Sequence, residues 1–200
     1  MTATATQRQF VSFSEYLLRP YDRKRTELVD GTIRVMAEAS PLHVLIIKLL
    51  QRLLDNYLQD TASEMETYSG CGVEIPRVDR DSNTRTPDLV VCSQAQFEDM
   101  LGLTKAIFLQ GNPPAIAIEV SSPSNTKTDT EDKRIEYALA GIDEYWIVNP
   151  VDGYVMTLSL VGQMYEEIGT FRGSEAIHSK LLPDFRPIAS TLLRGKRVES

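Results

Sequence analysis

The chain is poor in the residues that build disulfide frameworks and zinc sites. It has two cysteines, Cys71 and Cys92, which are isolated and form no CxxC pair, so a disulfide scaffold is excluded. It has two histidines, His43 and His178, so a zinc site of mixed Cys and His ligands would need nearly all of these scattered residues. We therefore do not expect a zinc-binding fold.

Long apolar runs are also missing. No run approaches the roughly 18 apolar residues that span a bilayer, and the opening stretch MTATATQRQF lacks the apolar core of a secretory signal. We therefore expect a cytoplasmic protein. The formal net charge of −7 argues against a protein whose whole surface coats nucleic acid, but it does not exclude a local basic groove.

The composition of the 200 residues is that of a globular domain. Hydrophobic residues make up 42% and charged residues 24%, close to the average for folded proteins. No internal repeat or linker is visible. We predict one domain over residues 13–193, between a flexible N-terminal tail at 1–12 and a C-terminal tail at 194–200.

The main core helix is predicted to begin at Ser40-Pro41, because Ser40 suits the N-cap and Pro41 the first helical position. Apolar residues then recur at three-to-four spacing as far as Leu58. A capping-box pattern that starts at Ser12 predicts a shorter helix, which precedes the main core helix in the sequence. The Asp-Gly dipeptide at 30–31 between two alternating segments predicts a hairpin.

Three short apolar runs rich in β-branched residues predict buried strands at 87–92, 115–120 and 144–148. A helix with a capping-box start is expected over 128–140, between the last two strands. A polar loop is expected at 77–85. Two further alternating runs after residue 153 predict a C-terminal β-meander. This order predicts an α/β (α+β) protein with a mixed central sheet, flanking helices and a crossover helix.

Two carboxylates stand at the ends of buried strands. Asp88 begins the first of these strands and Glu119 lies near the end of the second. A charge within an apolar run is costly unless it is paired or binds a cation. Carboxylates at neighbouring strand ends can supply oxygen ligands to one Mg²⁺ ion, and removing one charge, as in Asp88→Asn, should then relieve repulsion in the metal-free protein.

The helix after Glu119 offers a cation. Lys133 and Tyr137 are spaced i and i+4, so they share one face of the helix. Lys133 can point back at the carboxylates or lie as an ordinary lysine on the helix surface, and its own sequence does not decide between the two.

Five motifs in order carry a family resemblance. They are TELVDGTI, SPLH, PDLVV, PAIAIEVSSPS with the following D-x-x-x-K-x-x-x-Y, and GIDEYWIVNP, and the closing LLPDF adds to them. Together they resemble a large bacterial family of restriction-endonuclease-like proteins, formerly described only as a domain of unknown function. The resemblance covers about residues 13–193 and implies the PD-(D/E)XK nuclease fold.

In that superfamily an Asp and a Glu on neighbouring strands hold a divalent metal, and a Lys two residues after the Glu assists the attacking water. Asp88 and Glu119 match the first two positions. The third position is Ser121, so the resemblance implies that the lysine has moved to the following helix as Lys133. Lys127, in the preceding loop, is the competing candidate.

Two further positions match the family. The resemblance implies that Glu27 is a further metal ligand or a water contact. The alternative is that Glu27 is an ordinary charged residue at the edge of a hairpin. His43 is expected in the first turn of the core helix as a hydrogen-bonded structural histidine rather than a ligand. Tyr137 is expected to pack beside Lys133.

Nucleic-acid binding needs cations near phosphates. The available cations are the run Arg23-Lys24-Arg25, then Arg77, Arg80 and Arg85, then Lys127, Lys133 and Arg134. Of these, the side chains that we select for this role are Arg77, Arg80, Arg85 and Arg134. The first three lie in the segment that leads into Asp88, although charge clusters are often only solvated faces. No helix-turn-helix or zinc finger is readable, so no device for sequence specificity is visible.

The resemblance implies a metal-dependent endonuclease that hydrolyses DNA phosphodiester bonds with Mg²⁺ or Mn²⁺. One alternative is a catalytically inactive nuclease-fold protein that binds nucleic acid or a protein partner. Another is a hydrolase of a small phosphorylated substrate. The sequence leaves open DNA against RNA, and whether the chain forms the homodimer that cutting both strands of a duplex often uses.

Overall fold

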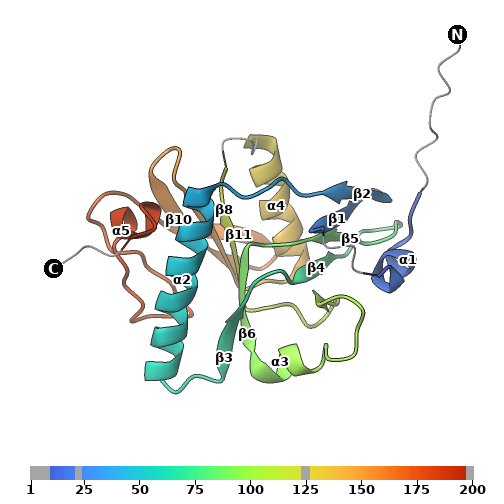
Figure 1. The fold of residues 1–200 in the computed structure, drawn as a ribbon, viewed down its shortest axis with the longest axis horizontal. Helices are drawn as coiled ribbons and strands as arrows, with labels where there is room; N and C mark the ends of the chain where they lie inside the picture. The colour runs from blue at the N-terminus through green and yellow to red at the C-terminus, as the bar shows by residue number, and fades with distance from the viewer. Residues whose placement is uncertain (1–9, 21–23, 123–126, 197–200) are drawn as a thin grey trace, which may run out of the picture.

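A mixed six-stranded sheet forms the centre of the protein (Figure 1). The computed structural model describes residues 10–20, 24–122 and 127–196. For residues 127–129 it describes the backbone but not the side chains. The strands, in their spatial order, are β11 (Met164–Phe171), β10 (Tyr154–Val161), β9 (Glu144–Asn149), β8 (Ile116–Val120), β6 (Leu89–Ser93) and β3 (Met65–Tyr68). Within this sheet β8 and β9 run parallel, and each other neighbouring pair is antiparallel. The parallel pair requires a crossover, which α4 (Lys127–Ala140) provides.

Helices cover both faces of the sheet, and strand alternation decides which side chains meet them. Helix α2 (Pro41–Asp60) packs with Ile116, Ile118 and Val120 of β8, in a cluster that also includes α5 (Ala189–Leu193). The alternate residue Ala117 belongs to the cluster on the α4 side. Glu119 follows the same alternation and meets α4 side chains there. A buried carboxylate is thus directed toward the crossover helix.

A second, smaller layer lies beside the central sheet (Figure 1). It consists of a three-stranded sheet, a hairpin and two short helices, namely β5 (Asn83–Arg85), β4 (Gly72–Ile75), β7 (Ile107–Phe108), β1 (Thr26–Val29), β2 (Thr32–Val35), α1 (Phe13–Leu18) and α3 (Gln94–Glu98). The β1–β2 turn has Asp30 and Gly31 at φ of 50° and 70°, the left-handed values that an Asp-Gly hairpin turn needs.

The predicted fold class is confirmed, including the mixed sheet, its crossover helix and the C-terminal meander as β10 and β11. Ser40 caps α2 by accepting from the His43 N–H at 3.3 Å, and Ser12 forms the predicted capping box with Glu15. The start of α4 differs from the prediction. The helix begins at Lys127, so Thr128 lies inside it rather than at its N-cap.

The prediction of a loop throughout 77–85 is wrong, because its last three residues form β5. This strand is polar but buried, and its side chains have partners on or next to β1. Asn83 accepts from the Asp30 N–H at 2.9 Å, and Thr84 accepts from the Leu28 N–H at 2.7 Å. Hydrophobic patterning gives no signal for such a strand, because hydrogen bonds rather than apolar contacts hold it.

Most residues of the two predicted tails, 1–9 and 197–200, lie outside the described residues. The part described includes Val11, whose N–H donates to the Gly31 carbonyl at 2.9 Å. Across the described ranges, none of the helices combines the length and the apolar character needed to cross a membrane.

Candidate active site

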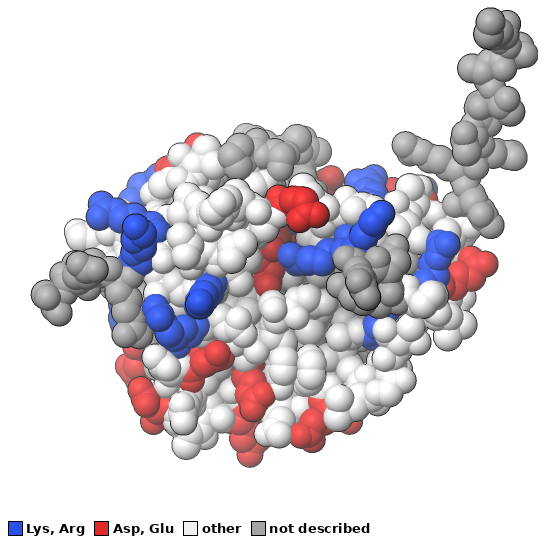
Figure 2. Space-filling view, viewed as in Figure 1, with Lys and Arg blue, Asp and Glu red and all other residues white. Residues whose placement is uncertain are grey.

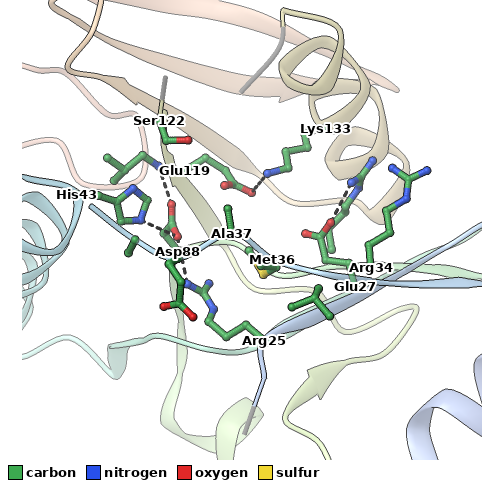
Figure 3. A pocket seen from close by; sticks show the side chains of 15 residues that line it. Arg25, Glu27, Arg34, Met36, Ala37, His43, Asp88, Glu119, Ser122 and Lys133 are labelled. Carbon is green, nitrogen blue, oxygen red and sulfur yellow. Dashed lines mark hydrogen bonds and ion pairs between the residues drawn. The ribbon is translucent and has the colours of Figure 1, made fainter. Parts of the chain in front are cut away.

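A pocket of about 370 Å³ opens between the N-terminal end of α2, the β1–β2 hairpin and the ends of β6 and β8 (Figure 3). Glu27, His43, Asp88, Glu119 and Lys133 all line it. These residues are far apart in the sequence and come from five different parts of the fold. The structure thus brings together the residues that the sequence analysis selected for chemistry.

Asp88 lies directly before β6 and is held by three donors. The Val120 N–H donates to Oδ2 at 2.9 Å, His43 Nε2 lies 3.2 Å from Oδ1, and the Arg25 guanidinium lies 3.5 Å from Oδ1. Burial raises the pKa of Asp88, but the hydrogen bond and charge of His43, the Val120 N–H and the Arg25 charge outweigh it and hold the pKa below its ordinary value. Asp88 is therefore ionised at neutral pH.

His43 is a hydrogen-bonded histidine, as expected. An ionised carboxylate can only accept, so Nε2 of His43 carries the proton that it shares with Asp88. The other ring nitrogen, Nδ1, is buried and has no hydrogen-bond partner among the described residues. His43 therefore orients Asp88 from the first turn of α2.

Glu119 is buried on the α4 side of the sheet, and α4 contributes both of its donors. Lys133 Nζ lies 3.0 Å from Oε1, and the Tyr137 hydroxyl donates to the same oxygen at 2.7 Å. Burial raises the pKa of Glu119 to about 7, with Lys133 opposing the rise and Asp88 adding to it. Since both donors use Oε1, no described residue donates to Oε2. Figure 3 shows Lys133 extending from α4 to this carboxylate.

The hydroxyl of Tyr137 goes beyond the expected packing against Lys133. It is fully buried, and burial together with the Glu119 charge raises its pKa well above the ordinary value. The hydroxyl is therefore a permanent donor at neutral pH. The i, i+4 spacing of Lys133 and Tyr137 lets both side chains reach one carboxylate.

Glu27 is paired on both oxygens. Oε2 lies 3.0 Å from Arg85 NH1, and Oε1 accepts from the Thr86 N–H at 3.0 Å. Arg85 also lies 2.5 Å from Glu136 of α4, and it is only 4% exposed. Arg85 therefore ties β1, β5 and α4 together beneath the pocket.

The other cations considered for nucleic acid do not gather at the pocket. Arg77 forms an ion pair with Asp30 at the hairpin turn, and Arg134 donates to the Tyr165 carbonyl at 2.8 Å. Arg80 is exposed, and neither it nor the other two lines the pocket. Buried Arg85 is the member of the set that does.

Two further positions bear on the displaced lysine. Ser121, which stands where the superfamily lysine is missing, extends the β8–β9 ladder through its N–H, which donates to the Val148 carbonyl at 2.8 Å, and it does not line the pocket. Lys127 was expected in a loop but is the first residue of α4, and its side chain lies outside the described residues.

Four polar or charged lining residues were not selected as site residues, namely Arg25, Arg34, Glu38 and Ser122. Arg25 was grouped only with a run of cations before β1, and its side chain is 39% exposed at the pocket mouth. Arg34 is an exposed residue of β2. No local pattern marks these positions, because the hairpin reaches the pocket only through long-range packing.

The donor set fits a hard divalent cation. Asp88 and Glu119 are both buried and line one pocket, so the structure brings two carboxylate groups to the same cavity. Mg²⁺ typically takes one or two protein carboxylates and completes its shell with water and phosphate oxygens. Within the described ranges there is no group of three or more His, Cys, Asp or Glu side chains that could hold a metal.

The family of the chain follows from comparison with known proteins. A family model, Uma2, with the description "Putative restriction endonuclease", matches residues 13–192. The chain belongs to the Uma2 family. This membership supports a nuclease function and hence a nucleic-acid substrate for the chain.

The Uma2 chain shares its fold with a solved structure. It is the crystal structure of "a putative nuclease belonging to DUF820" from Anabaena variabilis, with a TM-score of 0.73 and 15% sequence identity. The match covers 92% of this chain and 98% of that chain. At this identity the likeness concerns the fold alone. Among curated proteins, nothing matches the chain.

Proposed function

We propose that this Uma2 protein is a divalent-metal-dependent endonuclease that hydrolyses DNA phosphodiester bonds. The observation that carries the proposal is the meeting of Asp88, Glu119 and Lys133 in one pocket. The cytoplasmic location expected from the sequence remains part of this proposal, and so does the homodimer whose formation the sequence leaves open.

Asp88 and Glu119 are the residues that would hold Mg²⁺ or Mn²⁺. When bound, such an ion polarises a phosphate and lowers the pKa of a water molecule. Glu27 remains a weaker candidate for a ligand, because Arg85 and the Thr86 N–H already use its two oxygens. In this proposal its role is to hold Arg85.

Lys133 acts on the charge that grows during hydrolysis. The attacking water oxygen forms a bond to phosphorus while one ester P–O bond breaks, so negative charge grows on the phosphate oxygens and on the leaving oxygen. An ammonium 3.0 Å from Glu119 stands beside this reaction and can stabilise that charge or position the water. Tyr137 keeps Glu119 turned toward the pocket by its hydrogen bond.

The site is nearly balanced in charge before substrate arrives. Four carboxylates, Glu27, Asp88, Glu119 and Glu136, are in ion-pair contact with Arg25, Arg85 and Lys133. A divalent ion makes this cluster net positive, which suits an anionic phosphodiester.

The mouth of the pocket carries basic side chains beside acidic ones. Figure 2 shows acidic side chains along the edge formed by the C-terminal end of α2, β3 and α3, and others between the N-terminal end of α2 and the β1–β2 hairpin, next to basic side chains. Arg25 and Arg34 lie at the pocket mouth and would contact phosphates there.

A cleavage assay tests the proposal. Linear and circular DNA, and RNA in parallel, are incubated with the protein in Mg²⁺, Mn²⁺ or EDTA. We expect DNA cleavage with either metal, none in EDTA, and none by Glu119→Gln. Lack of cleavage of every substrate, with the wild type shown to be folded, would favour a non-catalytic nuclease-fold protein.

A further inference from the structure

A second pocket lies next to the proposed active site. It has a volume of about 490 Å³ and is bordered by α1, the start of β1, β5 and the segment before β7. Among the described residues that line it, none is acidic, although the chain carries a net charge of −7. Its described cations are Lys24, Arg25 and Lys105. We call it the threonine pocket, because Thr26, Thr84, Thr86 and Thr104 also line it.

The two pockets share their wall. In β1, Thr26 lines the threonine pocket and Glu27 lines the active-site pocket. In and just after β5, Thr84 and Thr86 line the threonine pocket while Arg85 lies on the active-site side. This is the alternation of a strand, whose successive side chains point to opposite faces. The pockets therefore lie on opposite sides of the same thin layer.

Arg25 lines both the active-site pocket and the threonine pocket. Its guanidinium lies 3.5 Å from Asp88 Oδ1 and 3.4 Å from the Pro87 carbonyl. An anionic chain that leaves the active-site pocket past Arg25 therefore enters a pocket lined by cations and hydroxyl groups.

Lys105 is the cation that distinguishes the threonine pocket. Its ammonium lies over the ring of Tyr16, 4.9 Å from the ring centroid, and no carboxylate of the described residues forms an ion pair with it. A cation–π contact leaves the positive charge uncancelled. The Tyr16 hydroxyl is fixed by the Thr26 carbonyl at 2.7 Å, so the platform under Lys105 is held in place.

We propose that the threonine pocket binds a phosphate of the nucleic-acid strand that flanks the scissile phosphate, with Arg25 between the two sites. Lys105 supplies the charge and the exposed Thr104 supplies a hydroxyl donor, while the hydroxyls of Thr26, Thr84 and Thr86 already have partners within the wall. This inference rests on the proposed function, because it takes the active-site pocket as the place of the scissile phosphate.

A binding experiment that needs no cleavage tests it. The affinity of a fluorescein-labelled oligothymidylate is measured by anisotropy in EDTA over a range of salt concentrations. For Lys105→Ala we expect about fivefold weaker binding and a salt slope that falls by about 0.7, the value for one lost contact to a single strand. Lys105→Arg should restore both. Lys48→Ala removes an exposed lysine of α2 that does not line either pocket, and it should match the wild type.

A second variant guards against a folding defect at Lys105. Thr104 is exposed, so Thr104→Glu should fold while placing a negative charge at the pocket, and we expect it to weaken binding as well. Wild-type affinity and salt slope in both Lys105→Ala and Thr104→Glu would overturn the inference and leave the proposed function standing. Dependence on Lys105 in a protein that cleaves nothing would support the subsite and contradict the catalytic proposal. No binding by the wild type in EDTA would overturn this inference, while the proposed metal-dependent cleavage would still be decided by the cleavage assay.

Discussion

Lys133 and Glu119 form a buried ion pair across two elements, with Nζ of the helix α4 residue 3.0 Å from Oε1 of the strand β8 residue. The position two residues after Glu119, where the resemblance to PD-(D/E)XK nucleases leads one to expect a lysine, is Ser121 in this chain. A helix that crosses from β8 to β9 thus delivers an ammonium to the carboxylate from outside the strand.

Replacing Lys133 should cost activity more than structure. We expect Lys133→Ala to lower the cleavage rate by about 10²–10³-fold, the typical loss for one donor that stabilises transition-state charge. Lys127→Ala should lose much less, and Ser121→Lys should partly rescue Lys133→Ala. Single-turnover rates measure these effects, with Lys48→Ala as the control. Wild-type rates in Lys133→Ala would rule out the displaced-lysine interpretation.

The effect of Asp88→Asn on the metal-free protein should be opposite in sign to the expectation from the sequence. Relief of repulsion was expected, but the carboxylate is held by His43, the Val120 N–H and Arg25, which lower its pKa. We expect the variant to lose about 1–3 kcal/mol of unfolding free energy at neutral pH.

The pH dependence of Asp88→Asn follows from the same shift. A depressed folded pKa contributes stability that is present above the ordinary value of 3.8 and is lost as the pH falls through the folded value. The difference in unfolding free energy between the wild type and Asp88→Asn should therefore become smaller at acidic pH. Urea denaturation at several pH values measures it, and a variant more stable than the wild type at neutral pH would restore the repulsion account.

The contribution of Glu119 to stability has the opposite pH dependence, because its pKa in the folded protein, about 7, lies above the ordinary value of 4.5. Its contribution to stability is fully present below the ordinary value and is lost as the pH rises through about 7. With about 1.4 kcal/mol per pKa unit, the loss is on the order of 3 kcal/mol. Glu119→Gln should therefore gain stability relative to the wild type between mildly acidic and mildly alkaline pH. A difference that stays constant with pH would contradict the raised pKa.

Arg85 decides between a structural and a nucleic-acid role for its segment. It is 4% exposed and pairs with both Glu27 and Glu136, so Arg85→Met removes the cation from the buried carboxylate of Glu27 and from the partly buried carboxylate of Glu136. We expect a loss of about 3–5 kcal/mol in stability. The exposed Arg80→Met is the matched control and should change stability by less than about 0.5 kcal/mol. If Arg85→Met were as stable as the wild type but bound DNA more weakly, Arg85 would instead be assigned as a contact to DNA phosphates.

Local sequence marked Asp88 and Glu119 as candidates, whereas the choice of Lys133 also needed the family resemblance. The two carboxylates interrupt apolar strands, where a charge is costly, and Lys133 follows from helical spacing together with the family motif. Capping of α2 by Ser40 was equally readable, because a cap depends on residues three positions apart.

The rest of the site depends on contacts between distant segments. Arg85 and Glu136 are 51 residues apart, and neither has a local pattern that marks it as buried. The polar strand β5 forms because its side chains make hydrogen bonds to residues on or next to β1. Hydrophobic periodicity in the sequence gives no signal for such bonds. Arg34 reaches the pocket only because the β1–β2 hairpin packs against β5.

The central claim is that Asp88 and Glu119 hold a divalent ion beside Lys133. Its most direct test is the anomalous difference density of crystals soaked in Mn²⁺. We expect a peak in the active-site pocket with an oxygen of each carboxylate about 2.1 Å from it, and no such peak in crystals of Glu119→Gln. A Mn²⁺ site elsewhere, or a peak that persists in Glu119→Gln, would contradict the account.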